Sequence, residues 1–238
     1  MKRLGLALLV CLGLVFSGAV LAQGDESGDP GAERAAVLRI GTEGTYPPFS
    51  YVDESGELVG FDIDVGVEVA RRLGMRAEFS LSLFTELIDR LQNDEFDVII
   101  AMMSATEERR AFVDFTDSYV ESGNVLVARQ DDDRFAELAD IAGHRVGVAA
   151  GTTFETLARS VDGAEVLLFD DFQAYIEALI AGDVDVIIED ELTALYNIQQ
   201  RGLPIKITSR AYETQGAAIA VKKGDHELLE ALNRILAE

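Results

Sequence analysis

The stretch Ile99–Arg110, IIAMMSATEERR, joins the end of an apolar segment to a short polar turn and an arginine. The run FDVII (96–100) is short and β-branched, which is typical of a buried parallel strand. Thr106, followed by two glutamates and Arg109, has the pattern of a helix cap and first turn. Arg109 is therefore predicted at the carboxyl edge of a sheet, where its guanidinium can bind a carboxylate through two hydrogen bonds. Taken alone, the stretch also fits a solvated arginine that pairs with a neighbouring glutamate.

Short apolar strands alternate with amphipathic helices on both sides of this stretch, and this order predicts parallel sheets. The strands are predicted at 37–42, 76–81, 96–101, 145–150, 164–169, 184–189 and 204–209. The helices are predicted at 61–73, 84–92, 152–160, 171–181, 191–201 and 225–237. The extended segments 123–129 and 216–221 are predicted to cross between two lobes. The fold class is therefore α/β, with two parallel-sheet lobes joined by two crossing strands.

The crossings divide the chain into two lobes. Lobe 1 is predicted to comprise residues 37–124 together with 217–238, and lobe 2 residues 125–216. We expect a hinge near Gly123 and Gly216, with a ligand cleft outside the carboxyl ends of the strands. The last helix is expected to pack back on lobe 1.

The first 22 residues have the pattern of a secretory signal. Lys2 and Arg3 precede the apolar run Leu4–Leu21, and Val20-Leu21-Ala22 fits a cleavage site. A flexible leader is predicted at 23–36, which is rich in Gly, Asp and Glu. The single cysteine, Cys11, lies inside the signal, so the exported domain is predicted to lack disulfides. These features predict an exported protein, and the family resemblance given below implies the periplasm as its location.

Acidic residues dominate the composition. The formal net charge is −23, and loss of Lys2 and Arg3 with the signal makes it two units more negative. This sign disfavours binding to nucleic acids and to anionic membranes. No cofactor or metal site is indicated: His144 and His226 stand alone without a cysteine partner, and no phosphate-binding glycine loop is present.

Five segments, in order, resemble the periplasmic amino-acid-binding proteins of ABC importers, solute-binding protein family 3, of the polar and basic amino-acid type. They lie at 40–51, 56–74, 114–119, 143–158 and 181–196, beside the stretch 99–110. The resemblance runs from about Val37 to the end of the chain. It implies a two-lobe clamshell that captures a free L-amino acid and delivers it to the membrane subunits of an ABC permease. We expect a monomer.

The resemblance implies three patches for the three parts of an amino acid. For the carboxylate it implies Arg109, Ser104 and, from lobe 2, Gly151 and Thr153 beside free backbone N–H groups. Thr152, between the last two, has the alternative role of a plain helix cap.

For the ammonium, the resemblance selects Asp190, at the end of the strand VDVIIED. Its neighbour Glu189 competes for this role, but successive strand residues face opposite ways. We therefore expect Glu189 to be oriented by its helix or by solvent. Asp190 has the alternative role of capping the helix that follows.

For the side chain, the resemblance implies the rings of Tyr46 and Phe84 around the ligand stem and Glu43 at its far end. This set suits a cation, so arginine, ornithine and lysine are the expected ligands. Cystine and glutamine remain open, because their receptors also carry an acidic residue at this position. Phe84 has the alternative role of a core residue.

Two residues of the stretch 99–110 complete the predicted site. Ala101 is expected to contribute its backbone carbonyl. Met102 departs from the family pattern, which has serine or glycine there, and its thioether removes one hydrogen-bond donor near the ligand.

Two other functional classes were weighed against a binding protein. Cyclohexadienyl dehydratases share the architecture, but they carry an N-P-G-G-T-N-like loop where this chain has AAGTTF (149–154). A sensory domain of a membrane receptor is disfavoured because the sequence shows no second membrane span. We therefore expect a binding protein that is not an enzyme.

Overall fold

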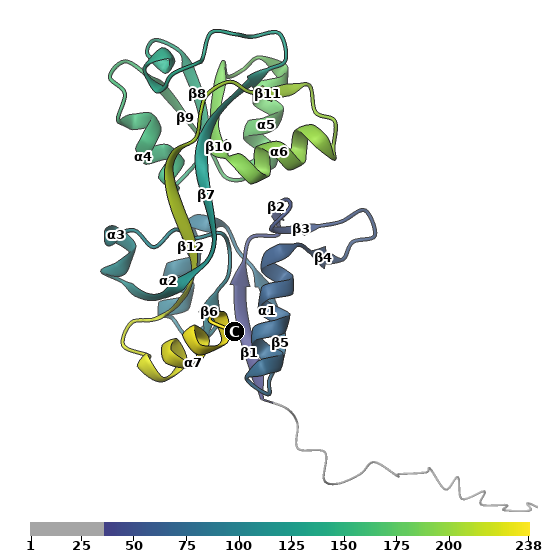
Figure 1. The fold of residues 1–238 in the computed structure, drawn as a ribbon, viewed down its shortest axis with the longest axis vertical. Coiled ribbons are helices and arrows are strands. Elements are labelled where there is room, and N and C mark those ends of the chain that lie inside the picture. Colours follow the sequence, from purple (N-terminus) through teal and green to yellow (C-terminus); the bar gives the residue numbers. More distant parts are fainter. Residues whose placement is uncertain (1–35) are drawn as a thin grey trace, which may run out of the picture. The chain divides into compact units, whose positions relative to one another are not determined.

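Two long antiparallel strands, β7 (Val113–Arg129) and β12 (Tyr212–Lys222), run between two α/β lobes in the computed structural model (Figure 1). The structure describes residues 36–238, apart from the side chains of residues 214 and 215. The predicted signal peptide and nearly all of the predicted leader lie outside the described residues. The two predicted crossings fall inside β7 and β12, and both strands are longer than expected because each also pairs within its lobes.

Lobe 1 is built on the strand order β5-β1-β6-β12. β1 is parallel to both β5 and β6, as predicted. The strands of its main sheet are β1 (Val37–Thr42), β5 (Arg76–Leu81) and β6 (Val98–Ile99), and a small second sheet holds β2 (Thr45–Tyr46), β3 (Ser50–Val52) and β4 (Leu58–Val59). The helices are α1 (Phe61–Arg72), η1 (Phe84–Glu86), α2 (Leu87–Gln92), α3 (Glu107–Arg110) and α7 (His226–Leu236).

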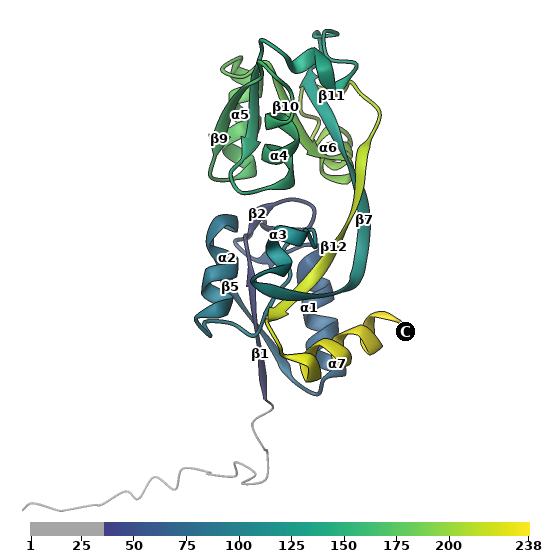
Figure 2. The ribbon, with the colours of Figure 1, turned by 90° about the vertical axis from the view of Figure 1, so that its left-hand side faces the viewer.

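The last helix, α7, packs on lobe 1, as expected. Leu232 is fully buried in a cluster with Leu38, Ile40 and Val69. The chain end is also tied to α1, because Arg72 pairs with Glu238 at 3.1 Å. Segments from opposite ends of the described chain therefore share one core. The quarter-turn view in Figure 2 shows α7 in lobe 1 with α1 and β1.

Lobe 2 continues the sheet in the order β7-β10-β8-β9. Its strands are β8 (Arg145–Ala149), β9 (Glu165–Phe169), β10 (Val186–Asp190) and β11 (Ile205–Ile207), of which β11 pairs with β7. Its helices are η2 (Leu138–Ile141), α4 (Thr153–Arg159), α5 (Phe172–Ala181) and α6 (Glu191–Gln199). β8 is parallel to β9 and β10, so their carboxyl ends share one edge.

The α/β fold with two parallel-sheet lobes and two crossing strands is confirmed. The predicted lobe boundaries, after residues 124 and 216, fall inside the long strands and stay predictions. Among residues 36–238, no helix has both the length and the apolar character that a bilayer crossing requires.

Candidate functional site

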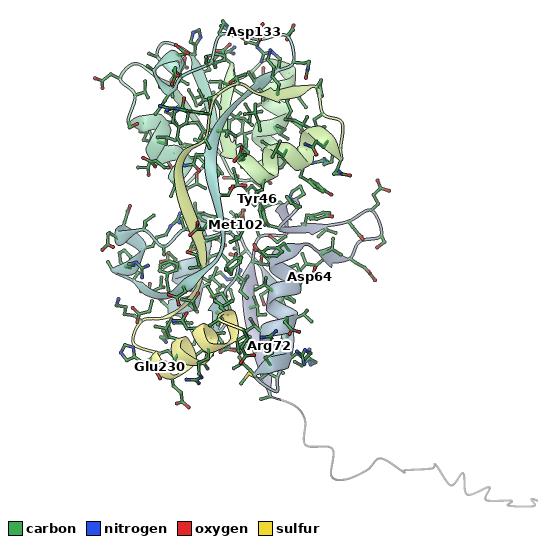
Figure 3. All side chains as sticks on the ribbon, viewed as in Figure 1. Tyr46, Asp64, Arg72, Met102, Asp133 and Glu230 are labelled. Carbon is green, nitrogen blue, oxygen red and sulfur yellow. The ribbon has the colours of Figure 1, made fainter. Side chains whose placement is uncertain are left out.

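The carboxyl ends of strands from both lobes meet at one cavity, which nine of the ten predicted site residues line. Figure 3 shows two of them, Tyr46 and Met102, where the lobes meet. The cavity measures about 60 Å³, which is room for a few water molecules. Gly151 lies beside it, lining the neighbouring groove instead. The structure therefore brings nine of the predicted residues together at the strand ends, and their role in binding stays a prediction.

Arg109 is held by α3 as the sequence predicted. The Thr106 hydroxyl caps that helix by accepting from the Arg109 backbone N–H. The guanidinium donates to the carbonyls of Ser104, at 2.8 Å, and Gly151, at 3.0 Å, so it links the two lobes. Burial lowers the pKa of Arg109 to about 10. Because its bonds go to neutral carbonyls, this half-buried cation is suited to receive an anion.

The loop after β8 supplies the lobe 2 side of the same patch. Gly151 has a φ of +71°, which glycine adopts without strain, so it turns the chain as predicted. Thr152 is the helix cap: its hydroxyl accepts from the Glu155 N–H at 3.4 Å. Thr153, the first residue of α4, lines the cavity.

Asp190 ends β10, lines the cavity and also caps α6. Its Oδ1 accepts from the backbone N–H groups of Leu192, at 2.9 Å, and Thr193, at 3.2 Å. The capping role and the predicted ammonium contact are compatible, because both bonds use the same oxygen and leave Oδ2 for a ligand. Burial raises the pKa of Asp190, and the Ser122 hydroxyl and the two N–H groups oppose this.

The expectation that Glu189 is oriented by its helix or by solvent was wrong. Its carboxyl is 1% exposed and accepts from the hydroxyls of Tyr46, at 2.6 Å, and Tyr175, at 2.5 Å. Alternation along β10 does turn Glu189 away from Asp190. However, Tyr175 of α5 and Tyr46 of β2 cover that face, so Glu189 is shielded from solvent.

Glu43 follows β1 and lines the cavity, and it has no hydrogen-bond or ion-pair partner among the described residues. Glu43 is half-buried. Burial raises the pKa of Glu43 to about 8, and the negative charges of Asp62, Asp171 and Glu189 add to the rise. The carboxyl therefore lacks the cation that would keep it ionised at neutral pH.

Aromatic rings form the apolar wall of the cavity. Tyr46 meets Phe172 edge-on, with ring centroids 6.0 Å apart. Phe84 begins η1 and lines the cavity, and the Arg109 guanidinium lies 5.0 Å from its ring centroid. Phe84 also packs against a buried lobe 1 cluster. Both readings of this ring, as a cavity wall and as a packing residue, are therefore compatible with its position.

Met102 has a backbone conformation that non-glycine residues rarely adopt, with φ at +48°. Its N–H donates to the Tyr119 hydroxyl at 3.1 Å, and that hydroxyl donates to the buried Asp62 carboxylate at 2.8 Å. The neighbouring Ala101 is 2% exposed and lines the cavity. Tyr119 and Asp62 thus hold the turn that follows β6 in place.

Sequence reasoning missed several cavity residues. They are Ser122, Asn124, Ala149, Phe154, Phe172, Tyr175 and Ala217. Asn124 is 5% exposed, and its side-chain nitrogen has no hydrogen-bond partner. Asn124 faces Asp190 across the ladder between β7 and β10. Its position on an apolar strand gave no signal, because the pairing of β7 with β10 brings it to the cleft.

Metal binding has no support in the described residues. Among residues 36–238, no three His, Cys, Asp or Glu side chains are grouped so that they could hold a metal ion. The absence of a cofactor stays a prediction.

We expect the ligand-free protein to lose stability as the pH rises from 5.5 to 9. Glu43 and Glu189 have folded-state pKa values of about 8 and Asp62 of about 7, all raised by burial above the unfolded values. The folded state therefore holds more protons than the unfolded state between about pH 4.5 and 8, so the free energy of unfolding falls over that range. We expect a loss of at least about 2 kcal/mol.

Thermal melting in ligand-free buffer at pH 5.5, 7 and 9 measures this loss. Glu43→Gln should flatten the slope, because it removes one of the three titrating groups. A melting temperature that rises with pH in the wild-type protein would contradict the prediction.

A comparison of the sequence with known protein families agrees with this geometry. Residues 38–238 match the family model of bacterial extracellular solute-binding proteins, family 3. The chain belongs to this family. It is 33% identical to the histidine-binding periplasmic protein of Salmonella typhimurium, over 100% of this chain and 92% of that protein. It is 30% identical to the L-cystine-binding protein TcyJ of Escherichia coli, over 97% of this chain and 87% of that one.

Solved structures that are similar to this chain show the same two-lobe fold. An ancestral arginine-binding protein bound to arginine superposes with a TM-score of 0.82 at 39% identity, over 86% of this chain and 92% of that chain. An ancestral amino-acid-binding protein, described as a precursor of cyclohexadienyl dehydratase, has a TM-score of 0.80 at 29% identity, over 85% of this chain and 88% of that chain. The similar proteins named here are binding proteins.

Proposed function

We propose that this family-3 protein captures a free L-amino acid in the periplasm and delivers it to an ABC permease. The observation that carries the proposal is the pairing of opposite charges in one cavity. Arg109 is half-buried and bonded to carbonyls only, and Asp190 keeps one oxygen outside its helix cap. Both line the cavity, as a zwitterion requires. The ligand carboxylate would meet Arg109, Ser104 and Thr153, and its ammonium would meet Asp190.

The ligand side chain is proposed to be cationic. Of the described residues that line the cavity, Arg109 alone is cationic, whereas Glu43 and Asp190 are both acidic. A zwitterion pairs with Arg109 and Asp190 and leaves Glu43 without a cation. A guanidinium or ammonium at the end of the ligand side chain would supply a cation for Glu43, beside the ring of Tyr46. Arginine is the first candidate, followed by ornithine and lysine, with cystine and glutamine as the alternatives.

Ligand entry is proposed to require separation of the lobes. The cavity of about 60 Å³ holds a few waters, whereas an amino acid brings about ten heavy atoms. The carboxylate donors are also divided between Arg109 on lobe 1 and Thr153 on lobe 2. A hinge in β7 and β12, near Gly123 and Gly216, would open the cleft and close it on the ligand.

The remaining parts of the proposal concern export and partners. Residues 1–22 would direct secretion, and the mature chain would act as a monomer in the periplasm with the membrane subunits of a permease as its partner. Its lobes would divide at the predicted boundaries. The high negative charge supports a role without nucleic acid.

A dehydratase is the second candidate, favoured by the likeness to the dehydratase precursor. The loop that would carry that chemistry reads AAGTTF here, at 149–154. It serves to cap α4 through Thr152 and to bind Arg109 through the Gly151 carbonyl. We therefore propose binding without catalysis.

We expect L-arginine to raise the melting temperature of the protein. At a ligand concentration of 100 times Kd, binding to the folded state alone adds about 2.7 kcal/mol, which corresponds to roughly 5–10 °C for a chain of this size. A thermal-shift screen of the amino acids measures this, with D-arginine as the matched control. If only cystine, glutamine or aliphatic amino acids shifted the transition, the cationic pocket would be wrong. If no amino acid did, the proposed function would be wrong.

A further inference from the structure

Glu189 is an almost fully enclosed carboxyl at the junction of the two lobes, 1% exposed. Oε1 accepts from the Tyr46 hydroxyl at 2.6 Å and from the Asp190 N–H at 2.7 Å, and Oε2 accepts from the Tyr175 hydroxyl at 2.5 Å. These three bonds fill most of the acceptor sites of a carboxylate. Glu189 is also absent from the cavity lining. Its partners are therefore protein groups.

The three donors come from different parts of the fold. Tyr175 lies on α5 and Asp190 ends β10, so two of the bonds stay within lobe 2. Tyr46 ends β2 in lobe 1, so the third bond crosses the cleft. Separation of the lobes has to break this bond, because the Tyr46 hydroxyl and the carboxyl move with different lobes.

The hydroxyl bond also fixes the ring that forms part of the cavity wall. Tyr46 is 9% exposed. Its ring stacks on Phe49, with centroids 5.9 Å apart, and meets Phe172 of lobe 2 edge-on at 6.0 Å. With one edge of the ring packed and its hydroxyl held by Glu189, the ring has one orientation in the closed cleft. The ring lines the cavity, and the hydroxyl faces Glu189 of lobe 2.

We propose that Glu189 is a positioning residue of the binding site, which holds the Tyr46 ring against the ligand and couples its placement to closure of the lobes. This inference rests on the proposed function, in which Tyr46 contacts the ligand side chain. Through its bond from the Asp190 N–H, the same carboxyl joins the ammonium-binding strand end to the lobe 1 ring. Glu189 acts without contacting the ligand.

The test is a double-mutant cycle of Tyr46→Phe and Glu189→Gln, with two measurements. Small-angle scattering gives the radius of gyration of the ligand-free protein, and calorimetry gives the Kd for L-arginine. Each single variant should enlarge the ligand-free radius and raise Kd about 5- to 50-fold. The double variant should resemble Tyr46→Phe alone, because Glu189→Gln only removes the charge that strengthens the bond across the cleft, and Tyr46→Phe removes that bond altogether.

Tyr175→Phe is the matched control for the scattering measurement. It removes a hydroxyl from the same carboxyl, but within lobe 2, so the ligand-free radius should stay at the wild-type value. Tyr46→Phe keeps the test valid if Glu189→Gln fails to fold, since it removes one oxygen atom and leaves the buried carboxyl intact.

Two results would overturn the proposal: a wild-type radius in Tyr46→Phe, or effects on Kd that multiply fully in the double variant. If the wild-type protein bound no L-arginine, the proposed ligand would be wrong. The ligand-free radii of gyration of Tyr46→Phe and Tyr175→Phe would then decide the role of Glu189 without any binding measurement.

Discussion

Arg109→Ala is expected to weaken L-arginine binding by about 2 to 5 kcal/mol, roughly 30- to several-thousand-fold in Kd. The guanidinium is half-buried and donates to two carbonyls, and it has no carboxylate bonded to it in the described chain. A ligand carboxylate would be its first anionic partner. Without Arg109 that carboxylate would be desolvated in the cleft and left with hydroxyl and backbone donors only. Isothermal titration calorimetry measures the loss.

Arg110→Ala is the matched control for this prediction. Arg110 is the next residue of α3, but its side chain lies over Phe115 and 4.0 Å from Glu107, outside the cavity lining. Its removal should leave Kd within about twofold of the wild-type value. Arg109→Lys should be intermediate, because lysine keeps the charge but loses the planar pair of donors. Undiminished affinity in Arg109→Ala would rule out this carboxylate anchor.

Local sequence signals were sufficient for most element positions. Helix caps show why: Thr106, Asp171 and Asp190 each accept a backbone N–H of the helix that follows them. A cap and an apolar period are encoded within a few residues, so they can be read from the chain directly. The predicted helices accordingly agree with the structure to within about two residues at each end.

Features that depend on distant partners were not predictable from the sequence. β7 has 17 residues because it pairs with β12, β10 and β11 in turn. β6 is only two residues long, because the chain leaves the sheet at Ala101 and turns at Met102. Pairing and tertiary packing decide both lengths, and no local pattern records them.

The candidate site was predictable to the extent that its residues stand at strand ends. Asn124, Phe172 and Tyr175 were missed because an amide in an apolar strand and two rings three apart on a helix are also ordinary core patterns. Glu189 was misjudged for a related reason. Alternation along β10 gave its direction correctly, but only the folded chain shows that α5 and Tyr46 occupy the space there.

Glu43→Gln is expected to weaken L-arginine binding by about 10- to 100-fold at pH 8 while leaving any L-glutamine binding within about threefold. Glu43 lines the cavity without a partner, so a cationic side chain would form its only ion pair there. Glutamine at position 43 keeps the size and polarity of the side chain but removes the charge. Calorimetry with the two ligands separates the loss of charge from a general disturbance of the cleft. An equal loss for both ligands would contradict a cation-specific role.

The pH dependence of binding tests the same charge in the wild-type protein. With a ligand-free pKa of about 8, Glu43 is mostly protonated at pH 6, and a guanidinium binds its ionised form. Arginine affinity should therefore rise roughly 50-fold from pH 6 to pH 8, because the cost of deprotonation disappears over that range. Glu189 and Asp62 titrate over a similar range, so the Glu43→Gln variant is needed to isolate the contribution of Glu43.

In the Glu43→Gln variant the rise in affinity should be largely lost. At pH 7 the wild-type protein should release nearly one proton per arginine bound, because the new ion pair lowers the pKa of Glu43 well below 7. The dependence of the calorimetric enthalpy on the ionisation enthalpy of the buffer counts that proton. The same wild-type slope and proton count in the variant would show that another carboxyl carries the linkage, and the cationic ligand would lose its main support in the structure.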